Sequence, residues 1–112
     1  MKNKIILVPF PFDDLSSSKV RPALCLTDSI GAYDHVVISF ITSQIAGASE
    51  PSDLRIITTD PDFELTGLKL DSVIRLHRLV TIPTRLIQRQ LGVLPGSYQF
   101  VLEQKLRALF TL

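Results

Sequence analysis

An arginine and a histidine one residue apart are the strongest candidates for chemistry in this sequence. Arg75 and His77 lie in an alternating stretch, Ser72 to Val80, where Ile74 and Leu76 occupy one face of a predicted strand. Because residues i and i+2 of a strand point to the same side, Arg75 and His77 are predicted to stand together on the other face. Histidine can move a proton near neutral pH, and guanidinium can stabilise the charge of a phosphorane. The pair suits phosphodiester chemistry, although an ordinary solvated strand face would carry the same residues.

Three further residues with hydrogen-bonding side chains, Thr42, Ser43 and Gln44, follow an apolar stretch that predicts a strand. They are placed to contact a substrate, and a strand-terminating turn explains them equally well. The single cysteine, Cys25, lies in another predicted strand, where a buried thiol is ordinary and a nucleophile is not favoured. The two histidines and scattered acids match no metal-ligand spacing, so we expect no metal and no other cofactor.

The charges are unevenly distributed along a chain whose total is close to neutral. Twelve Lys and Arg against 11 Asp and Glu give +1, yet residues 50–64 carry a net −4 and residues 66–94 a net +4. The small total excludes a non-specific polyanion binder. It leaves two readings open, a basic face that follows a phosphate backbone and an ordinary mixed surface.

Size and composition predict one domain over residues 1–112, with no linker or repeat. A hydrophobic content of 46% and a charged content of 21% exclude a disordered chain. The mean hydropathy of +0.28 indicates either a well-filled core or a subunit interface. A lone cysteine fits a reducing cytoplasm, and no apolar stretch approaches the ~20 residues that a membrane helix needs. We therefore expect a cytoplasmic protein with no membrane contact.

Short strand candidates separated by turn residues dominate the chain. We expect strands over Lys4–Val8, Pro22–Leu26, Val36–Thr42, Leu54–Thr58, Ser72–Val80 and Leu86–Leu91. From Ser97, a plausible N-cap, apolar residues recur at helical spacing and predict a C-terminal helix. The pattern indicates a mainly β, barrel-like domain with one C-terminal helix, and it excludes a parallel α/β fold.

Several short motifs occur in order along residues 5 to 92. The most specific is Val8-Pro9-Phe10-Pro11-Phe12, followed by a short polar loop and Lys19-Val20-Arg21-Pro22-Ala23-Leu24. The later motifs are Phe40-Ile41-Thr42-Ser43-Gln44, Gly67-Leu68, Ser72-Val73-Ile74-Arg75 and Leu91-Gly92. As an ordered set, they resemble the MazF/PemK toxins of type II toxin–antitoxin systems.

The resemblance implies an SH3-like barrel that forms a homodimer. Members of this family are metal-independent, sequence-specific endoribonucleases of single-stranded RNA, mostly messenger RNA. The 2′-hydroxyl is the nucleophile, and the products carry a 2′,3′-cyclic phosphate and a 5′-hydroxyl. A cognate antitoxin occupies the RNA groove and blocks it. A smaller branch with the same fold poisons DNA gyrase instead.

The resemblance assigns catalytic roles to Arg21, Thr42, Arg75 and His77. Arg21 matches the arginine that contacts the scissile phosphate, and Thr42 matches the threonine that hydrogen-bonds beside it. Arg75 matches an arginine that serves some members as acid or charge stabiliser. Two residues further on, the family often has an acid that serves as base, and here His77 takes that place.

The residues expected to bind RNA are Phe10, Phe12, Lys19, Ser43, Gln44 and Arg78. Phe10 and Phe12 flank the polar loop, where they can stack on unpaired bases or pack in the core.

Two other functions stay open on the sequence. One is a non-enzymatic module that binds a partner such as gyrase, and the other is a degenerate member that only binds its antitoxin. Besides His77, the chain departs from the family where Asn3-Lys4 replaces a glycine followed by an acid.

Overall fold

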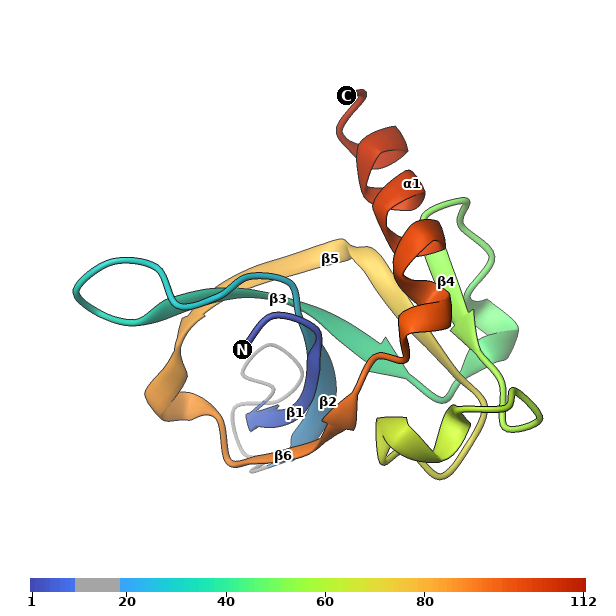
Figure 1. Cartoon of the computed structure of the whole chain (residues 1–112), viewed down its shortest axis with the longest axis horizontal. Helices are drawn as coiled ribbons and strands as arrows, with labels where there is room; N and C mark the ends of the chain where they lie inside the picture. Colours follow the sequence, from blue (N-terminus) through green and yellow to red (C-terminus); the bar gives the residue numbers. More distant parts are fainter. Residues whose placement is uncertain (10–18) are drawn as a thin grey trace.

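A computed structural model describes residues 1–9 and 19–112 of the chain (Figure 1). Its strands are β1 (Lys4–Pro9), β2 (Val20–Cys25), β3 (His35–Thr42), β4 (Asp53–Ile56), β5 (Ser72–Pro83) and β6 (Arg89–Val93). They form one antiparallel sheet in the order β4-β5-β3-β2-β1-β6. The sheet curls into a half-barrel, and the helix α1 (Gln99–Leu109) follows it. The predicted mainly β fold with a C-terminal helix is confirmed.

Apolar residues form a cluster on each face of the sheet. One cluster contains Ile5, Leu24, Ile41, Leu54, Ile56, Ile74, Leu76, Leu94 and, from α1, Leu102. The other contains Ile6, Val8, Ala23, Cys25, Val36, Ile38 and Phe40. Because neighbouring residues of a strand face opposite sides, β1 and β2 supply both clusters. Two filled faces account for much of the hydrophobic content. Within the described residues, no helix has the length and apolar character needed to cross a membrane.

Two glycines allow a short 3₁₀ turn, η2 (Phe63–Thr66), to press against the backbone of β6. A Cβ on Gly67 would lie 2.1 Å from the carbonyl oxygen of Leu91, and one on Gly92 would lie 2.2 Å from that of Leu65. Gly67 also has φ +72°, a conformation that disfavours other residues. The motifs Gly67-Leu68 and Leu91-Gly92 therefore form a single contact, which holds η2 on the sheet.

The middle of β5 is irregular where it crosses β3. Ser39 pairs with Leu79 and Ile41 with Ile74, so the four residues of β5 from 75 to 78 lie opposite one residue of β3. The Ser39 hydroxyl donates a hydrogen bond to the Arg75 carbonyl oxygen at 2.6 Å. This bond satisfies a backbone acceptor inside the irregularity. The side chains of residues 75–78 therefore need not alternate between the two faces of the sheet.

Several predicted boundaries are wrong: β2 begins at Val20 and not at Pro22, β4 ends at Ile56 and not at Thr58, and β5 continues past Val80 to Pro83. The last strand begins at Arg89 and not at Leu86, because a 3₁₀ turn, η3 (Thr84–Leu86), follows β5. Ser97 does not cap α1, because it lies inside another 3₁₀ turn, η4 (Gly96–Tyr98), that leads directly into the helix. Tyr98, the residue before the helix, already has helical dihedral angles, and no side chain caps it. A further 3₁₀ turn, η1 (Ile45–Gly47), follows β3.

Candidate active site

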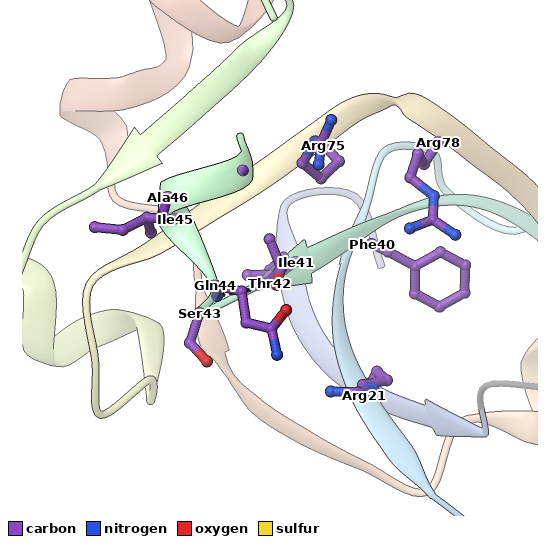
Figure 2. Close-up of a pocket in the computed structure, with 11 residues that line it drawn as sticks. Arg21, Phe40, Ile41, Thr42, Ser43, Gln44, Ile45, Ala46, Arg75 and Arg78 are labelled. Atoms are coloured by element: carbon purple, nitrogen blue, oxygen red, sulfur yellow. Dashed lines mark hydrogen bonds between the residues drawn. The ribbon is translucent and has the colours of Figure 1, made fainter. Parts of the chain in front are cut away.

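A cavity of about 800 Å³ opens beside the start of β2 and the end of β3 (Figure 2). Its polar lining consists of Arg21, Thr42, Ser43, Gln44, Arg75 and Arg78. Phe40, Ile41 and the turn η1 complete the wall. Six of the residues proposed from sequence, three of them catalytic candidates, therefore meet in one cavity although they are far apart in the chain.

The register of β2 and β3 explains why Arg21 approaches Thr42. Ala23 pairs with Phe40, and the next pairs run away from the cavity. Extending that antiparallel register by two residues places Arg21 opposite Thr42. The ladder itself ends at Ala23, next to Pro22, which has no N–H to donate. The cavity lies where the two strands part.

Thr42 is the last residue of β3, and its hydroxyl is held by the backbone that follows. The Gln44 N–H donates a hydrogen bond to Thr42 Oγ1 at 3.1 Å. This bond uses the oxygen as an acceptor and leaves the hydroxyl proton available for a ligand. Thr42 is half-buried, whereas Ser43 and Gln44 are exposed at the turn. The predicted strand-end position of all three is confirmed.

Arg75 and Arg78 both line the cavity from the irregular part of β5. Strict alternation would place residues three apart on opposite faces of a strand. The four-to-one stretch opposite Phe40 removes that restriction. Arg75 is partly buried and Arg78 is exposed, so the cavity has one guanidinium deep in its wall and one near solvent.

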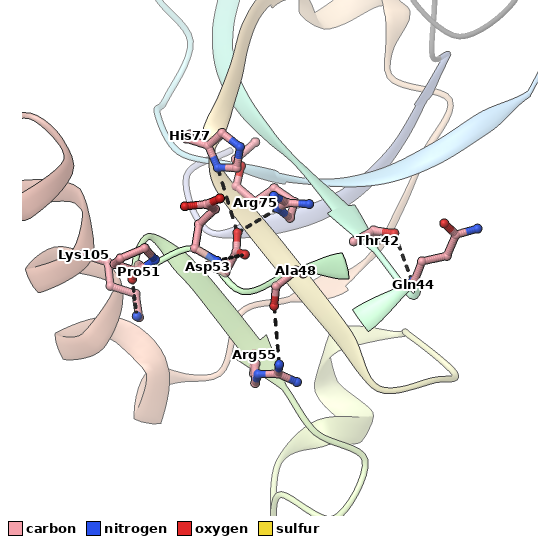
Figure 3. Close-up of polar contacts among 11 residues, drawn as sticks. Thr42, Gln44, Ala48, Pro51, Asp53, Arg55, Arg75, His77 and Lys105 are labelled. Carbon is pink, nitrogen blue, oxygen red and sulfur yellow. Dashed lines mark hydrogen bonds and ion pairs between the residues drawn. The ribbon is translucent and has the colours of Figure 1, made fainter. Parts of the chain in front are cut away.

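A buried carboxylate, Asp53, stands between Arg75 and His77 (Figure 3). Arg75 Nε donates to Asp53 Oδ1 at 2.8 Å, and His77 Nδ1 lies 4.0 Å from the same oxygen. Ile74 and Leu76, in contrast, are fully buried in the core. The expectation that Arg75 and His77 share a face is therefore confirmed.

His77 nevertheless does not line the cavity that contains Arg21. It lines a second cavity of about 760 Å³, between the loop 50–52 and the α1 residues Phe100, Val101 and Leu109. A base must lie within hydrogen-bonding reach of the proton that it removes. Within the described residues, Asp53 and Arg75 connect His77 to the first cavity.

The charged groups that line the first cavity, within the described residues, are three arginines and no acid. Such a lining can bind a phosphodiester and stabilise additional negative charge on it. Lys19 is exposed directly before β2 and does not line the cavity, and Phe10 and Phe12 lie outside the described residues. No group of three or more metal-ligating side chains occurs in residues 1–9 and 19–112.

Asp53 is not among the site residues predicted from the sequence, where it was only one of the acids of residues 50–64. Asp53 opens β4 and pairs directly with Arg75 in β5. The acidic and basic stretches are thus antiparallel neighbours at this point. An acid at the start of a strand whose next residues include Leu54 and Ile56 was the available signal, because a carboxylate there must find a partner.

One family model matches nearly the whole chain. The family model of the PemK-like, MazF-like toxin of type II toxin–antitoxin systems matches residues 1–110. No curated protein sequence matches the chain.

Solved structures give the same result for the fold. The toxin MazF-mt6 of Mycobacterium tuberculosis is 23% identical, with 97% of each chain covered and a TM-score of 0.74. An endoribonuclease from a mycobacterial species, solved with its cognate antitoxin, is 13% identical, with 100% of this chain and 95% of that one covered and a TM-score of 0.72. MazF from Deinococcus radiodurans is 18% identical over 99% and 96%, with a TM-score of 0.69.

Proposed function

Because this chain belongs to the PemK-like, MazF-like toxins of type II toxin–antitoxin systems, we propose that it is a sequence-specific, metal-independent endoribonuclease of single-stranded RNA. The observation that carries the proposal is the convergence of Arg21, Thr42 and Arg75 on one cavity. Two guanidinium groups and a hydroxyl with a free proton form a site for one phosphodiester.

The reaction begins when the 2′-oxygen attacks the adjacent phosphorus. A P–O bond forms to the 2′-oxygen and the P–O5′ bond breaks, so no water is consumed. The 2′-hydroxyl loses its proton and the 5′-oxygen gains one, which gives a 2′,3′-cyclic phosphate and a 5′-hydroxyl. Arg21 and Thr42 hold the non-bridging oxygens, and Arg75 stabilises the charge of the phosphorane.

For His77 we propose a role other than the general base that the sequence predicted. Its Nδ1 lies 4.0 Å from Asp53 Oδ1, and its ring faces the second cavity. We propose that His77 influences the reaction through Asp53 and Arg75 and does not contact the 2′-hydroxyl.

The RNA strand is proposed to run across the cavity mouth. Ser43, Gln44 and Arg78 line that mouth and offer hydrogen bonds and one positive charge. Lys19 directly precedes β2, two residues before Arg21, and adds a second charge. Phe10 and Phe12 are proposed to stack on unpaired bases, which is how single-stranded RNA is commonly read.

The proposed partners are a cognate antitoxin and a second copy of the chain, in the cytoplasm. The mycobacterial endoribonuclease of the same fold was solved with its antitoxin, which supports the first partner. A row of exposed α1 residues, Phe100, Val101 and Ala108, lines the second cavity and supports the homodimer. Burial of such apolar surface is a common driving force for association between subunits.

The test compares two arginine variants on a long RNA in the presence of EDTA. Arg21→Ala should lower the cleavage rate by about 10²-fold or more, the usual loss when one charge-stabilising donor is removed. Arg107→Ala, which removes an exposed arginine from α1, is the matched control and should cleave like the wild type. Equal rates for all three proteins would overturn the site, and toxicity without any cleavage would favour a gyrase-binding or antitoxin-binding module.

A further inference from the structure

We infer that Asp53 is a positioning residue of the proposed ribonuclease site and that it sets the orientation of the Arg75 guanidinium. The inference rests on the proposed function and assigns a role to a residue outside the cavity lining. Asp53 lies on β4, whereas the cavity is built from β2, β3, β5 and the turn η1.

Both oxygens of the Asp53 carboxylate have fixed partners. Oδ1 accepts the hydrogen bond from Arg75 Nε at 2.8 Å, and Oδ2 accepts one from the Glu50 N–H at 2.9 Å. The Asp53 N–H donates in turn to the Glu50 carbonyl oxygen at 3.0 Å. The Asp53 side chain is only 4% exposed, so its charge depends on these donors. The carboxylate therefore has one orientation.

That orientation determines which nitrogens of Arg75 remain for a ligand. Asp53 and Arg75 are a direct cross-strand pair, and the hydrogen bond occupies Nε. Within the described residues, this is the hydrogen bond that the structure gives to the guanidinium, so the two terminal nitrogens are left for the cavity that Arg75 lines. A guanidinium held at Nε presents its terminal N–H groups in a fixed plane, which suits two oxygens of one phosphate. Without Asp53, the side chain would have to be ordered when RNA binds.

The surrounding charges support a positioning role and not a direct catalytic one. Near the carboxylate, His77 Nδ1 lies 4.0 Å from Oδ1, and Lys105 of α1 donates a hydrogen bond to the Pro51 carbonyl oxygen at 2.8 Å. At 4.0 Å, His77 Nδ1 is too far from Oδ1 for a hydrogen bond, and His77 lines the second cavity. Asp53 is itself absent from the lining of the first cavity. Its effect on RNA must therefore pass through Arg75.

A purely structural role for Asp53 would make a different prediction. The reciprocal hydrogen bonds with Glu50 close a turn, so removing the carboxylate could simply loosen the loop before β4. Loss of stability would then lower activity to the same extent whether or not Arg75 is present. A double-mutant cycle separates the two roles, because coupled residues are not additive.

The experiment measures cleavage by the wild type, Asp53→Asn, Arg75→Ala and the double variant, with Asp62→Asn, a change in an exposed acid, as control. We expect Asp53→Asn to lower kcat roughly 10- to 100-fold with little change in KM, as misplacement of a charge-stabilising group does. It should cause no further loss in the Arg75→Ala background, and Asp62→Asn should match the wild type. An equal loss in both backgrounds would overturn the inference.

A second readout does not need cleavage. In ¹H–¹⁵N spectra, the Nε–H of Arg75, identified by its loss in Arg75→Lys, should exchange slowly with solvent in the wild type and quickly in Asp53→Asn. Unchanged exchange in Asp53→Asn overturns the inference, whatever the nuclease activity. A wild type that cuts no RNA but shows the protected Nε–H would instead contradict the proposed function and leave the contact between Asp53 and Arg75 established.

Discussion

The close contacts of Gly67, directly after η2, and of Gly92 in β6 allow a stability prediction with internal controls. Gly67→Ala introduces a Cβ 2.1 Å from a backbone oxygen at a residue with φ +72°. Gly31→Ala meets the same conformational problem, φ +74°, with no atom within 4 Å. Gly92→Ala introduces a clash at 2.2 Å without a positive φ, and Gly47→Ala introduces neither. The four variants separate the cost of the backbone conformation from the cost of the clash.

The expected sizes follow from these distances. A left-handed conformation costs a residue with a Cβ about 1–2 kcal/mol. Overpacking against atoms that must move costs about 1–3 kcal/mol, and because backbone atoms move reluctantly we expect the upper part of that range. Gly67→Ala should therefore be about 2–3 kcal/mol less stable than Gly31→Ala. The gain from a less flexible unfolded chain is common to each pair of variants and cancels in the comparison.

Thermal and urea unfolding followed by circular dichroism measures these differences. For a domain near 100 residues, each kcal/mol corresponds to about 4–8 °C in Tm. We expect Gly47→Ala to be more stable than Gly31→Ala, and Gly31→Ala to be more stable than Gly67→Ala. Gly92→Ala should be much less stable than Gly47→Ala. If Gly67→Ala matched Gly31→Ala, or Gly92→Ala matched Gly47→Ala, the close packing of η2 on β6 would be refuted.

Three further predictions concern other parts of the molecule. Burial raises the pKa of the Cys25 thiol, so a maleimide should label the native protein at least about 100-fold more slowly than the urea-unfolded chain, and equal rates would contradict the buried position. Val101→Glu should convert the proposed homodimer to monomer in analytical ultracentrifugation, whereas Glu103→Gln on the same helix should not; a dimer that persists in Val101→Glu would exclude this face of α1 as the interface. The hydrogen bond from the Thr58 N–H lowers the pKa of Asp71 below 3.8, so its contribution to stability is complete above that pH and is lost as the pH falls through the lowered value. Asp71→Asn should accordingly be less stable than the wild type at pH 7, and the difference in urea midpoint should vanish in strong acid; a constant difference would argue against the charged contact.

Much of the fold could be predicted from the sequence because the local hydrophobic patterns agree with the positions of the strands in the structure. The strands with buried, β-branched residues are found where the sequence predicts them, and Arg21 and Thr42 converge because β2 and β3 pair as a simple antiparallel neighbour pair. Asn3, directly before β1, has a φ of +72°, a conformation that asparagine tolerates.

The parts that could not be predicted depend on contacts between distant segments. The irregularity in β5 places Arg78 in the same cavity as Arg75, and it depends on the pairing with β3, which the sequence of β5 alone does not define. His77 shares a face with Arg75 but is separated from the cavity by Asp53, a residue 22 positions earlier than Arg75. A sequence pattern shows which face a side chain takes, not which partner on the next strand stands between it and the substrate.

The measurement that tests the central proposal most directly is the chemistry of the cut ends. A long single-stranded RNA should be incubated with the purified wild type in EDTA, and both new ends should be identified at nucleotide resolution. Attack by the 2′-hydroxyl in the cavity of Arg21, Thr42 and Arg75 predicts 2′,3′-cyclic phosphate and 5′-hydroxyl ends at a recurrent short sequence. Intact RNA, or ends that carry a 5′-phosphate and a 3′-hydroxyl, would contradict it.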